Sequence, residues 1–317
     1  MALSARRDLV LHGTSSGLKT FEQDFANICT CHTTDLSDAA ALRALIKHVK
    51  PDVVVHAAAI SSPRVCEDNP ERAMAVNAPM ALVEQLPDHA SLIFLSTDQV
   101  YDGEGAPYTE QSAALPVNTY GRSKLQFEQI LTSRLPKRHV SLRSSLILGP
   151  PPPRRCKKAH SFLQDCAKFL SDPAGNSFFS DEMRSAVSVD DVIGVIVWAI
   201  DGGATRSPGI YNMGGPAKLS RVDIALAVAE HCGLPPERVH GKPRPPGGPV
   251  KSPLDITMDS SRLEAVSGIK MRGLAQMLPA AFPHHRATTW GAGGTPLIAA
   301  LVLAACIALV MRVARSR

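Results

Sequence analysis

Two short stretches of the sequence combine side chains that could reduce a carbonyl group. The first is STDQVYDG at residues 96–103, and the second is YGRSK at residues 120–124. On a helix, Tyr120 and Lys124 lie one turn apart on the same face. The lysine ammonium then favours the phenolate and lowers the pKa of the phenol, so Tyr120 could give a proton to a carbonyl oxygen as hydride arrives at the carbon. Thr97 could hydrogen-bond the same oxygen and fix its place.

A tyrosine and a lysine four residues apart are also common on exposed helix surfaces. The surrounding chain favours the functional interpretation, because Thr97 ends an apolar segment and Tyr120 opens a helical one. Segments typical of strands are residues 8–14, 28–36, 51–59, 90–98 and 139–149, and segments typical of helices are residues 37–50, 70–86 and 118–135. This alternation predicts an α/β fold with a doubly wound parallel sheet, in which functional groups gather at the carboxyl ends of the strands.

The composition excludes several other classes of protein. Apolar residues make up 44% and charged residues 20% of the chain, as in globular proteins. The net charge of +5 is mild and the basic clusters lack interleaved aromatic residues, so we expect no nucleic-acid binding. The seven cysteines contain no CxxC pair, which favours reduced thiols in a cytosol-facing chain. Because His284 and His285 lack partners at ligand spacing, we expect no metal site.

The segment PLIAALVLAACIALVM at residues 296–311 is almost wholly apolar and has no polar face. Its length is near the lower end of a membrane span, and Arg312 follows it directly. We therefore expect a C-terminal transmembrane helix that anchors the protein in a membrane, with the globular part facing the cytosol. A buried C-terminal helix is the alternative.

Through STDQVYDG and YGRSK, the chain resembles the extended short-chain dehydrogenase/reductases, in their dTDP-4-dehydrorhamnose reductase-like (RmlD-like) branch. The resemblance extends over roughly residues 8–280 and includes PDVVVHAAA, LRSSLILGP, FFSDEMRSAVSVDDV and SPLDITMDSSRL. It implies reduction of a keto group with NADP or NAD as cofactor, on a small-molecule substrate such as a nucleotide sugar. The same branch includes the regulatory β subunit of methionine adenosyltransferase, so a non-catalytic partner of that enzyme's catalytic subunit is the alternative.

The resemblance also assigns roles to individual residues. It makes Tyr120 the acid, Lys124 its partner and a ribose ligand, and Thr97 the residue that orients the carbonyl group. The residues that it places along the cofactor groove, beside Tyr120 and Lys124, are Asp35, Leu36, Ala57, Ala58, Ala59 and Asn77. Ordinary packing at strand ends is the alternative for each of these six.

The substrate side is less well defined by the resemblance. Arg184 and Asp190 match a segment that shapes the substrate lobe, and a structural salt bridge is the alternative there. Gln99 and Tyr101 depart from the usual aromatic residues of their stretch, which leaves the substrate open. His56 lies on an apolar strand, and we expect it to pack in the core.

The stretch VLHGTSSG at residues 10–17 is placed like a phosphate-binding loop. Gly13 and Asp35 are too close in the sequence for the helix and two strands that must follow such a loop, so the stretch fits the end of the second strand. The first strand, glycine loop and first helix are then absent, and we expect NADP or NAD to bind weakly or not at all. The sequence is either a shortened version of a full enzyme or a naturally degenerate protein.

The predicted organisation has four parts. A truncated NAD(P)-binding domain occupies residues 1–149, and a substrate-binding lobe interleaved with the sheet occupies residues 150–283. A linker at residues 284–295 leads to the membrane anchor at residues 296–311.

Overall fold

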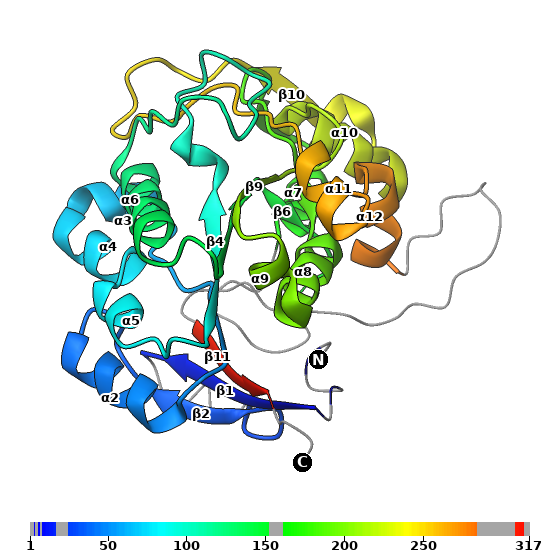
Figure 1. The fold of residues 1–317 in the computed structure, drawn as a ribbon. Helices are drawn as coiled ribbons and strands as arrows, with labels where there is room; N and C mark the ends of the chain where they lie inside the picture. Colours follow the sequence, from blue (N-terminus) through cyan, green and yellow to red (C-terminus); the bar gives the residue numbers. More distant parts are fainter. Residues whose placement is uncertain are drawn as a thin grey trace.

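A seven-stranded sheet forms the centre of the protein (Figure 1). The structure, a computed structural model, describes residues 3, 6, 8–16, 25–151, 161–283 and 308–313. The strands of the sheet are β1 (Leu9–Ser15), β2 (Thr30–Thr33), β3 (Val53–His56), β4 (Ser91–Thr97), β5 (His139–Ser144), β9 (Gly209–Met213) and β11 (Ala308–Val313). Their order is β2-β1-β11-β3-β4-β5-β9, and neighbouring strands are parallel except where β11 pairs with β1 and β3.

Helices cover both faces of the sheet. The helices that pack on one face are α2 (Ala39–Val49), α5 (Met80–Glu84) and α6 (Thr119–Arg134), and those on the other include α8 (Val189–Trp198) and α11 (Ser261–Ser267). Every residue of β3 and β4 is buried, as is usual for parallel strands covered on both sides. Along β4, Leu92 packs into the first layer and Leu95 into the second. The predicted Rossmann-like α/β fold with a doubly wound sheet is confirmed.

The second half of the chain adds β9 to this sheet and builds a further hydrophobic core beside it. This core packs around three helices, α7 (Phe162–Leu170), α10 (Arg221–Cys232) and α12 (Leu274–Ala281). Two pairs of short strands flank it, β6 (Ile147–Leu148) with β8 (Val187–Ser188) and β7 (Asn176–Phe179) with β10 (Val239–Lys242). Short helical segments connect these elements, namely η1 (Asp98–Val100), η2 (Ala199–Gly203), α9 (Ala204–Arg206) and η3 (Pro236–Arg238).

The single helix predicted at residues 70–86 is divided in two. After α3 (Pro63–Asp68), helix α4 (Pro70–Asn77) ends at Asn77, and Pro79 precedes α5. Proline lacks the N–H that would continue α4, and it disfavours a helical conformation at the residue before it. Because of this break, the chain changes direction after Asn77 before α5 packs on the sheet.

The prediction of a transmembrane helix at residues 296–311 is wrong. Its last four residues, 308–311, belong to the antiparallel strand β11, and residues 296–307 lie outside the described part of the chain. No helix in the described residues is long and apolar enough to cross a bilayer. The membrane localisation that we expected from this segment therefore has no support. The backbone N–H and C=O groups of a short apolar segment can form hydrogen bonds in a sheet as well as in a helix. The periodicity of such a segment does not distinguish a buried strand from a helix.

Strand β11 lies between β1 and β3 in the sheet, and Figure 1 shows it beside β1. In the usual order of Rossmann-type sheets, 3-2-1-4-5-6, this is the position of the first strand. β1 accordingly stands in the place of the second strand and β2 in the place of the third. Because β11 runs antiparallel, its first residue, Ala308, lies beside Thr14 and His56 at the carboxyl ends of β1 and β3.

Deleting residues 308–313 should expose the backbone amides of β1 and β3 that face β11. We expect hydrogen exchange in these two strands to become faster by about two orders of magnitude or more, because each strand loses its partner on one side. Mass spectrometry of exchange in the intact and shortened proteins measures this directly. β5 is the internal control, since β4 and β9 remain on either side of it. Equal protection of β1 and β3 in both proteins would contradict the pairing.

Candidate active site

The first turn of α6 is held tightly against its neighbours. Oδ1 of Asn118 accepts a hydrogen bond from the Gly121 N–H at 2.9 Å, which caps the helix. The Glu67 carboxylate on α3 accepts hydrogen bonds from the N–H and the hydroxyl of Thr119, both at 2.7 Å. A Cβ atom at position 121 would lie 2.1 Å from a carbonyl oxygen of η1, so only glycine allows α6 to come this close. These contacts fix the start of the helix that carries YGRSK.

Lys124 on α6 is almost completely buried behind the end of β4. Its Nζ donates a hydrogen bond to the Leu95 carbonyl oxygen at 2.7 Å and lies 4.5 Å from the centre of the Phe94 ring. Burial disfavours the ammonium and lowers the pKa of Lys124 to about 7, although the Glu128 carboxylate acts in the opposite direction. Among the described residues it has one hydrogen-bond acceptor, so two of its three N–H donors remain for a ligand.

Tyr120 is buried one turn before Lys124, with a relative exposure of 9%. Its ring packs in a small cluster with Cys66 and Ala73. Burial raises the pKa of the phenol, and the contact with the Thr97 side chain offsets only part of this effect. The expectation of a lowered pKa was wrong, because loss of water dominates and the nearby Asp98 carboxylate raises the pKa further. The phenol is therefore protonated at neutral pH, as a proton donor must be.

Thr97 ends β4 with its hydroxyl already engaged. Its Oγ1 accepts a hydrogen bond from the Gln99 N–H and donates one to Oδ1 of Asp98, both at 3.2 Å. Asp98 is itself buried and accepts a second hydrogen bond from Ser145 at 2.8 Å, and burial raises its pKa. The Thr97 hydroxyl can donate to a carbonyl oxygen only by leaving Asp98. The structure thus brings Thr97, Tyr120 and Lys124 together at one end of β4.

Asn77 and the three alanines predicted for the cofactor groove lie where β3 ends. The Asn77 amide accepts from the Ile60 N–H at 2.8 Å, and it donates to the Ile60 carbonyl at 3.2 Å and to Ser123 at 2.9 Å. Asn77 therefore ties the segment after β3 to α6. Ala58 is buried in the core, whereas Ala57 and Ala59 are partly buried beside it.

Asp35 and Leu36 follow β2, further along the same edge of the sheet. Asp35 forms an ion pair with Arg72 at 2.7 Å and accepts hydrogen bonds from Ser37, which lower its pKa to about 2. Leu36 packs in the hydrophobic core with α2. The Asp35 carboxylate is thus committed to an internal partner that a ligand would have to displace.

His56 is a core residue, as the sequence predicted. Its ring is completely buried, stacked on Phe94 and edge-on to Phe127. Burial, with a further contribution from the Lys124 charge, lowers the pKa of His56 to about 3. The ring is therefore neutral at physiological pH.

This neutral histidine should make the protein sensitive to acid. Below about pH 6.5 the unfolded chain takes up a proton at His56, whereas the folded protein does not until about pH 3. Stability contributed by the neutral ring is thus complete above pH 6.5 and falls as the pH is lowered toward 3. The variant His56→Leu should reduce the slope of unfolding free energy against pH in this window by up to about 1.4 kcal/mol per unit. Urea unfolding at several pH values measures the slope, with His89→Leu at an exposed position as the control. An unchanged slope in His56→Leu would exclude His56 as the cause.

Sequence reasoning missed two buried charged residues next to this site. Glu128 on α6 and Arg143 on β5 form an ion pair at 2.7 Å, and both side chains are at most 5% exposed. Glu128 could have been found, because Tyr120, Lys124 and Glu128 follow one another at intervals of four. Arg143 gave no local signal, since only the sheet brings it to α6.

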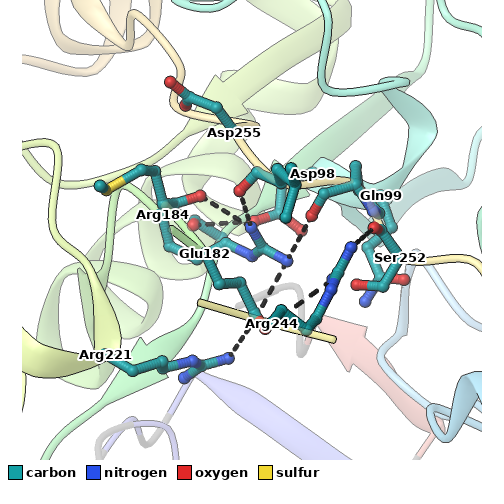
Figure 2. A network of polar contacts seen from close by, with 12 residues as sticks. Asp98, Gln99, Glu182, Arg184, Arg221, Arg244, Ser252 and Asp255 are labelled. Atoms are coloured by element: carbon teal, nitrogen blue, oxygen red, sulfur yellow. Dashed lines mark hydrogen bonds and ion pairs between the residues drawn. The ribbon is translucent and has the colours of Figure 1, made fainter. Parts of the chain in front are cut away.

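A second polar cluster lies beyond Asp98 (Figure 2). The Glu182 carboxylate is shared by three arginines, Arg184 at 3.2 Å, Arg221 at 3.0 Å and Arg244 at 4.0 Å. Arg184 also donates to the backbone carbonyls of Met183, Leu254 and Pro253. Three guanidinium groups therefore share one carboxylate, and the buried Asp98 lies near two of them, Arg184 and Arg221.

Arg184 and Asp190 are not brought together. Arg184 belongs to the cluster around Glu182, whereas Asp190 at the start of α8 pairs with Arg272 at 3.2 Å. Among the described residues, no group of three His, Cys, Asp or Glu side chains is arranged to hold a metal ion.

Comparison with known protein families gives a match over most of the chain. The profile of the RmlD substrate binding domain matches residues 14–286. The chain belongs to the RmlD substrate binding domain family.

Two kinds of relative in this family are similar to the chain. A protein from Xenopus tropicalis named methionine adenosyltransferase 2 subunit beta is 30% identical over 246 residues, which cover 75% of this chain and 71% of the relative. A dTDP-4-dehydrorhamnose reductase from Mycolicibacterium smegmatis is 31% identical over 247 residues, 76% of this chain and 72% of the relative. Among solved structures, a dTDP-4-dehydrorhamnose reductase from Bacillus anthracis in complex with NADP has a TM-score of 0.70 at 17% identity, covering 88% of this chain and 99% of that one.

Proposed function

We propose that this member of the RmlD family reduces a keto group of a nucleotide sugar, with NADP(H) or NAD(H) as cofactor. The observation that carries the proposal is the convergence of Thr97, Tyr120 and Lys124 at the carboxyl end of β4. In this scheme the protonated Tyr120 phenol gives its proton to the carbonyl oxygen, and Thr97 hydrogen-bonds the same oxygen. Lys124 stabilises the phenolate that remains.

The residues present fit a ribose of a nicotinamide cofactor better than they fit its pyrophosphate. The two spare donors of Lys124 suit the hydroxyls of a ribose, and the partly buried alanines after β3 leave room beside it. When bound, the cofactor would supply the hydride. At the phosphate end, β11 begins where a Rossmann helix would normally begin, so the described residues offer no helix N-terminus to a pyrophosphate there. We therefore expect weak cofactor binding, with a dissociation constant above the low-micromolar range.

The arginines around Glu182 support the choice of a nucleotide sugar as substrate. A diphosphate carries two or more negative charges, and arginine binds such groups with paired hydrogen bonds. Arg221 and Arg244 are partly exposed, whereas the Arg184 guanidinium is buried and already bound to backbone carbonyls. We assign diphosphate binding to the first two and support of the surrounding loops to Arg184.

The test is oxidation of NADPH in the presence of a dTDP-4-dehydro-6-deoxy sugar, followed by absorbance at saturating cofactor. Turnover that disappears without the sugar nucleotide is the expected result. The variant Arg221→Gln should raise KM about tenfold or more through loss of a charge-assisted hydrogen bond, with little change in kcat. Absence of oxidation at any cofactor concentration would refute the reductase proposal.

The alternative function is that of a regulatory partner of a methionine adenosyltransferase catalytic subunit. It is favoured by the 30% identity to a protein named as such a subunit, and by the antiparallel strand in the place where the cofactor fold normally starts. The test is the rate of S-adenosylmethionine formation by a catalytic subunit titrated with this protein. Tyr120→Phe separates the two functions, since it should abolish reduction but leave regulation unchanged. No binding at micromolar concentration would count against this function.

A further inference from the structure

Helix α6 presents three ionisable side chains, not two, on its buried face. Tyr120, Lys124 and Glu128 follow one another at intervals of four residues, which places them in one row along the helix. Glu128 has no exposed surface and Lys124 has 1%. The proposed reaction uses Tyr120 and Lys124 and gives no role to Glu128.

Glu128 is fixed in position as a carboxylate. Ser96 on β4 donates a hydrogen bond to Oε1 at 2.5 Å, and Arg143 on β5 donates to Oε1 and Oε2 at 2.7–3.1 Å. Arg143 also donates to the Tyr101 hydroxyl at 2.9 Å, and that hydroxyl donates to Asn212 at 2.7 Å. The network joins α6 to β4, β5 and β9. Arg143 is the positively charged partner that compensates for burial of a carboxylate.

The other groups that face Lys124 carry no negative charge. From β3 comes His56, whose buried ring is neutral, and from α3 comes Cys66, whose pKa burial raises to about 11. From its own helix comes the protonated Tyr120 phenol. Arg143 lies behind Glu128 and is positive. Among the described groups around Lys124, the negative charge is therefore that of Glu128.

We propose that Glu128 is a positioning residue, which keeps the buried Lys124 in its ammonium form by placing a fixed carboxylate one helical turn away. Only the catalytic consequence of this role rests on the proposed reductase function. A neutral amine at position 124 would not stabilise the Tyr120 phenolate and would have fewer N–H donors for a ribose. Without Glu128, the unpaired Arg143 charge would push Lys124 further toward the neutral amine.

The experiment is a pH titration of Lys124 by NMR of protein labelled with ¹³C at lysine Cε. The Lys124 signal is identified as the one missing from a Lys124→Arg variant. Burial and Glu128 together place the pKa of Lys124 near 7, and in Glu128→Gln we expect it to fall by about one unit or more. The ammonium fraction at pH 7 would then fall from about a half to about a tenth. Ser96→Ala is the matched control, because it removes a hydrogen bond to Glu128 but keeps the charge, and its titration should stay within about 0.3 units of the original.

Glu128→Gln leaves Arg143 unpaired and could unfold the protein. The double variant Glu128→Gln/Arg143→Gln removes both charges, and there we expect a downward shift that is smaller than in the single variant. A Lys124 titration unchanged in either folded variant overturns the proposal.

The titration needs neither cofactor nor turnover. Lack of reductase activity would therefore refute the proposed function without touching this inference. Where turnover is measurable, the pH at which it is half-maximal should move together with the titration of Lys124. Loss of activity in Glu128→Gln with an unmoved pH profile would indicate a structural role alone and would contradict the proposal.

Discussion

Replacing Tyr120 with phenylalanine should lower kcat for reduction of the keto sugar by about 10²- to 10⁴-fold, with little change in KM. General acid catalysis by a positioned side chain contributes about this much. The phenylalanine ring fills the same space beside Cys66 and Ala73, so the loss would come from the missing hydroxyl and not from repacking.

The measurement is steady-state NADPH oxidation with the substrate varied at saturating cofactor. Tyr211→Phe is the matched control, because its hydroxyl is also removed from a largely buried ring and donates only to the Ser207 carbonyl, at 3.0 Å, away from α6. Tyr211→Phe should retain nearly full kcat. If Tyr120→Phe retained more than about a tenth of the original kcat, Tyr120 would not be the acid.

Replacing Arg143 with methionine should lower the free energy of unfolding by about 3–5 kcal/mol. Its partner Glu128 has no exposed surface and would keep a buried charge without its direct ion-pair partner. The Tyr101 hydroxyl would also lose a hydrogen-bond donor. Equilibrium unfolding in urea measures the effect.

The double variant Glu128→Gln/Arg143→Met tests whether the cost comes from the unpaired charge. Removing both charges should restore most of the stability, because an uncharged pair of similar volume carries no large desolvation penalty. If the double variant were as unstable as Arg143→Met alone, loss of packing and not of charge pairing would explain the effect.

The site was predictable where its residues are close in the sequence or at the ends of adjacent strands. The interval between Tyr120 and Lys124 identifies one face of a helix. The apolar run before Thr97 predicts a strand, and the end of that strand places Thr97 next to the helix. The direction of the Tyr120 pKa was not predictable, because it depends on how completely the folded protein excludes water from the phenol.

The features that the sequence did not predict depend on contacts between distant segments. The arginines around Glu182 come from three segments that are separate in the sequence, and Arg143 reaches Glu128 only through the pairing of β4 with β5. The segment at residues 308–311 was assigned to the wrong environment because its composition suits a bilayer as well as the centre of a sheet. What decides between a bilayer and a sheet is the open strand position between β1 and β3. The sequence pattern of one segment does not reveal that position.

The position of β11 also sets the order in which the protein can be completed on the ribosome. β1 and β3 are made long before the strand that joins them, because β3 ends at His56 and β11 begins only at Ala308. At about 5–20 residues per second, the two strands wait on the order of tens of seconds for their shared partner. During this time both present unpaired backbone edges, which favour association with strands of other chains. A nascent chain with this topology should therefore depend on chaperones in proportion to the delay, and slower translation of the segment between β3 and β11 should increase its aggregation.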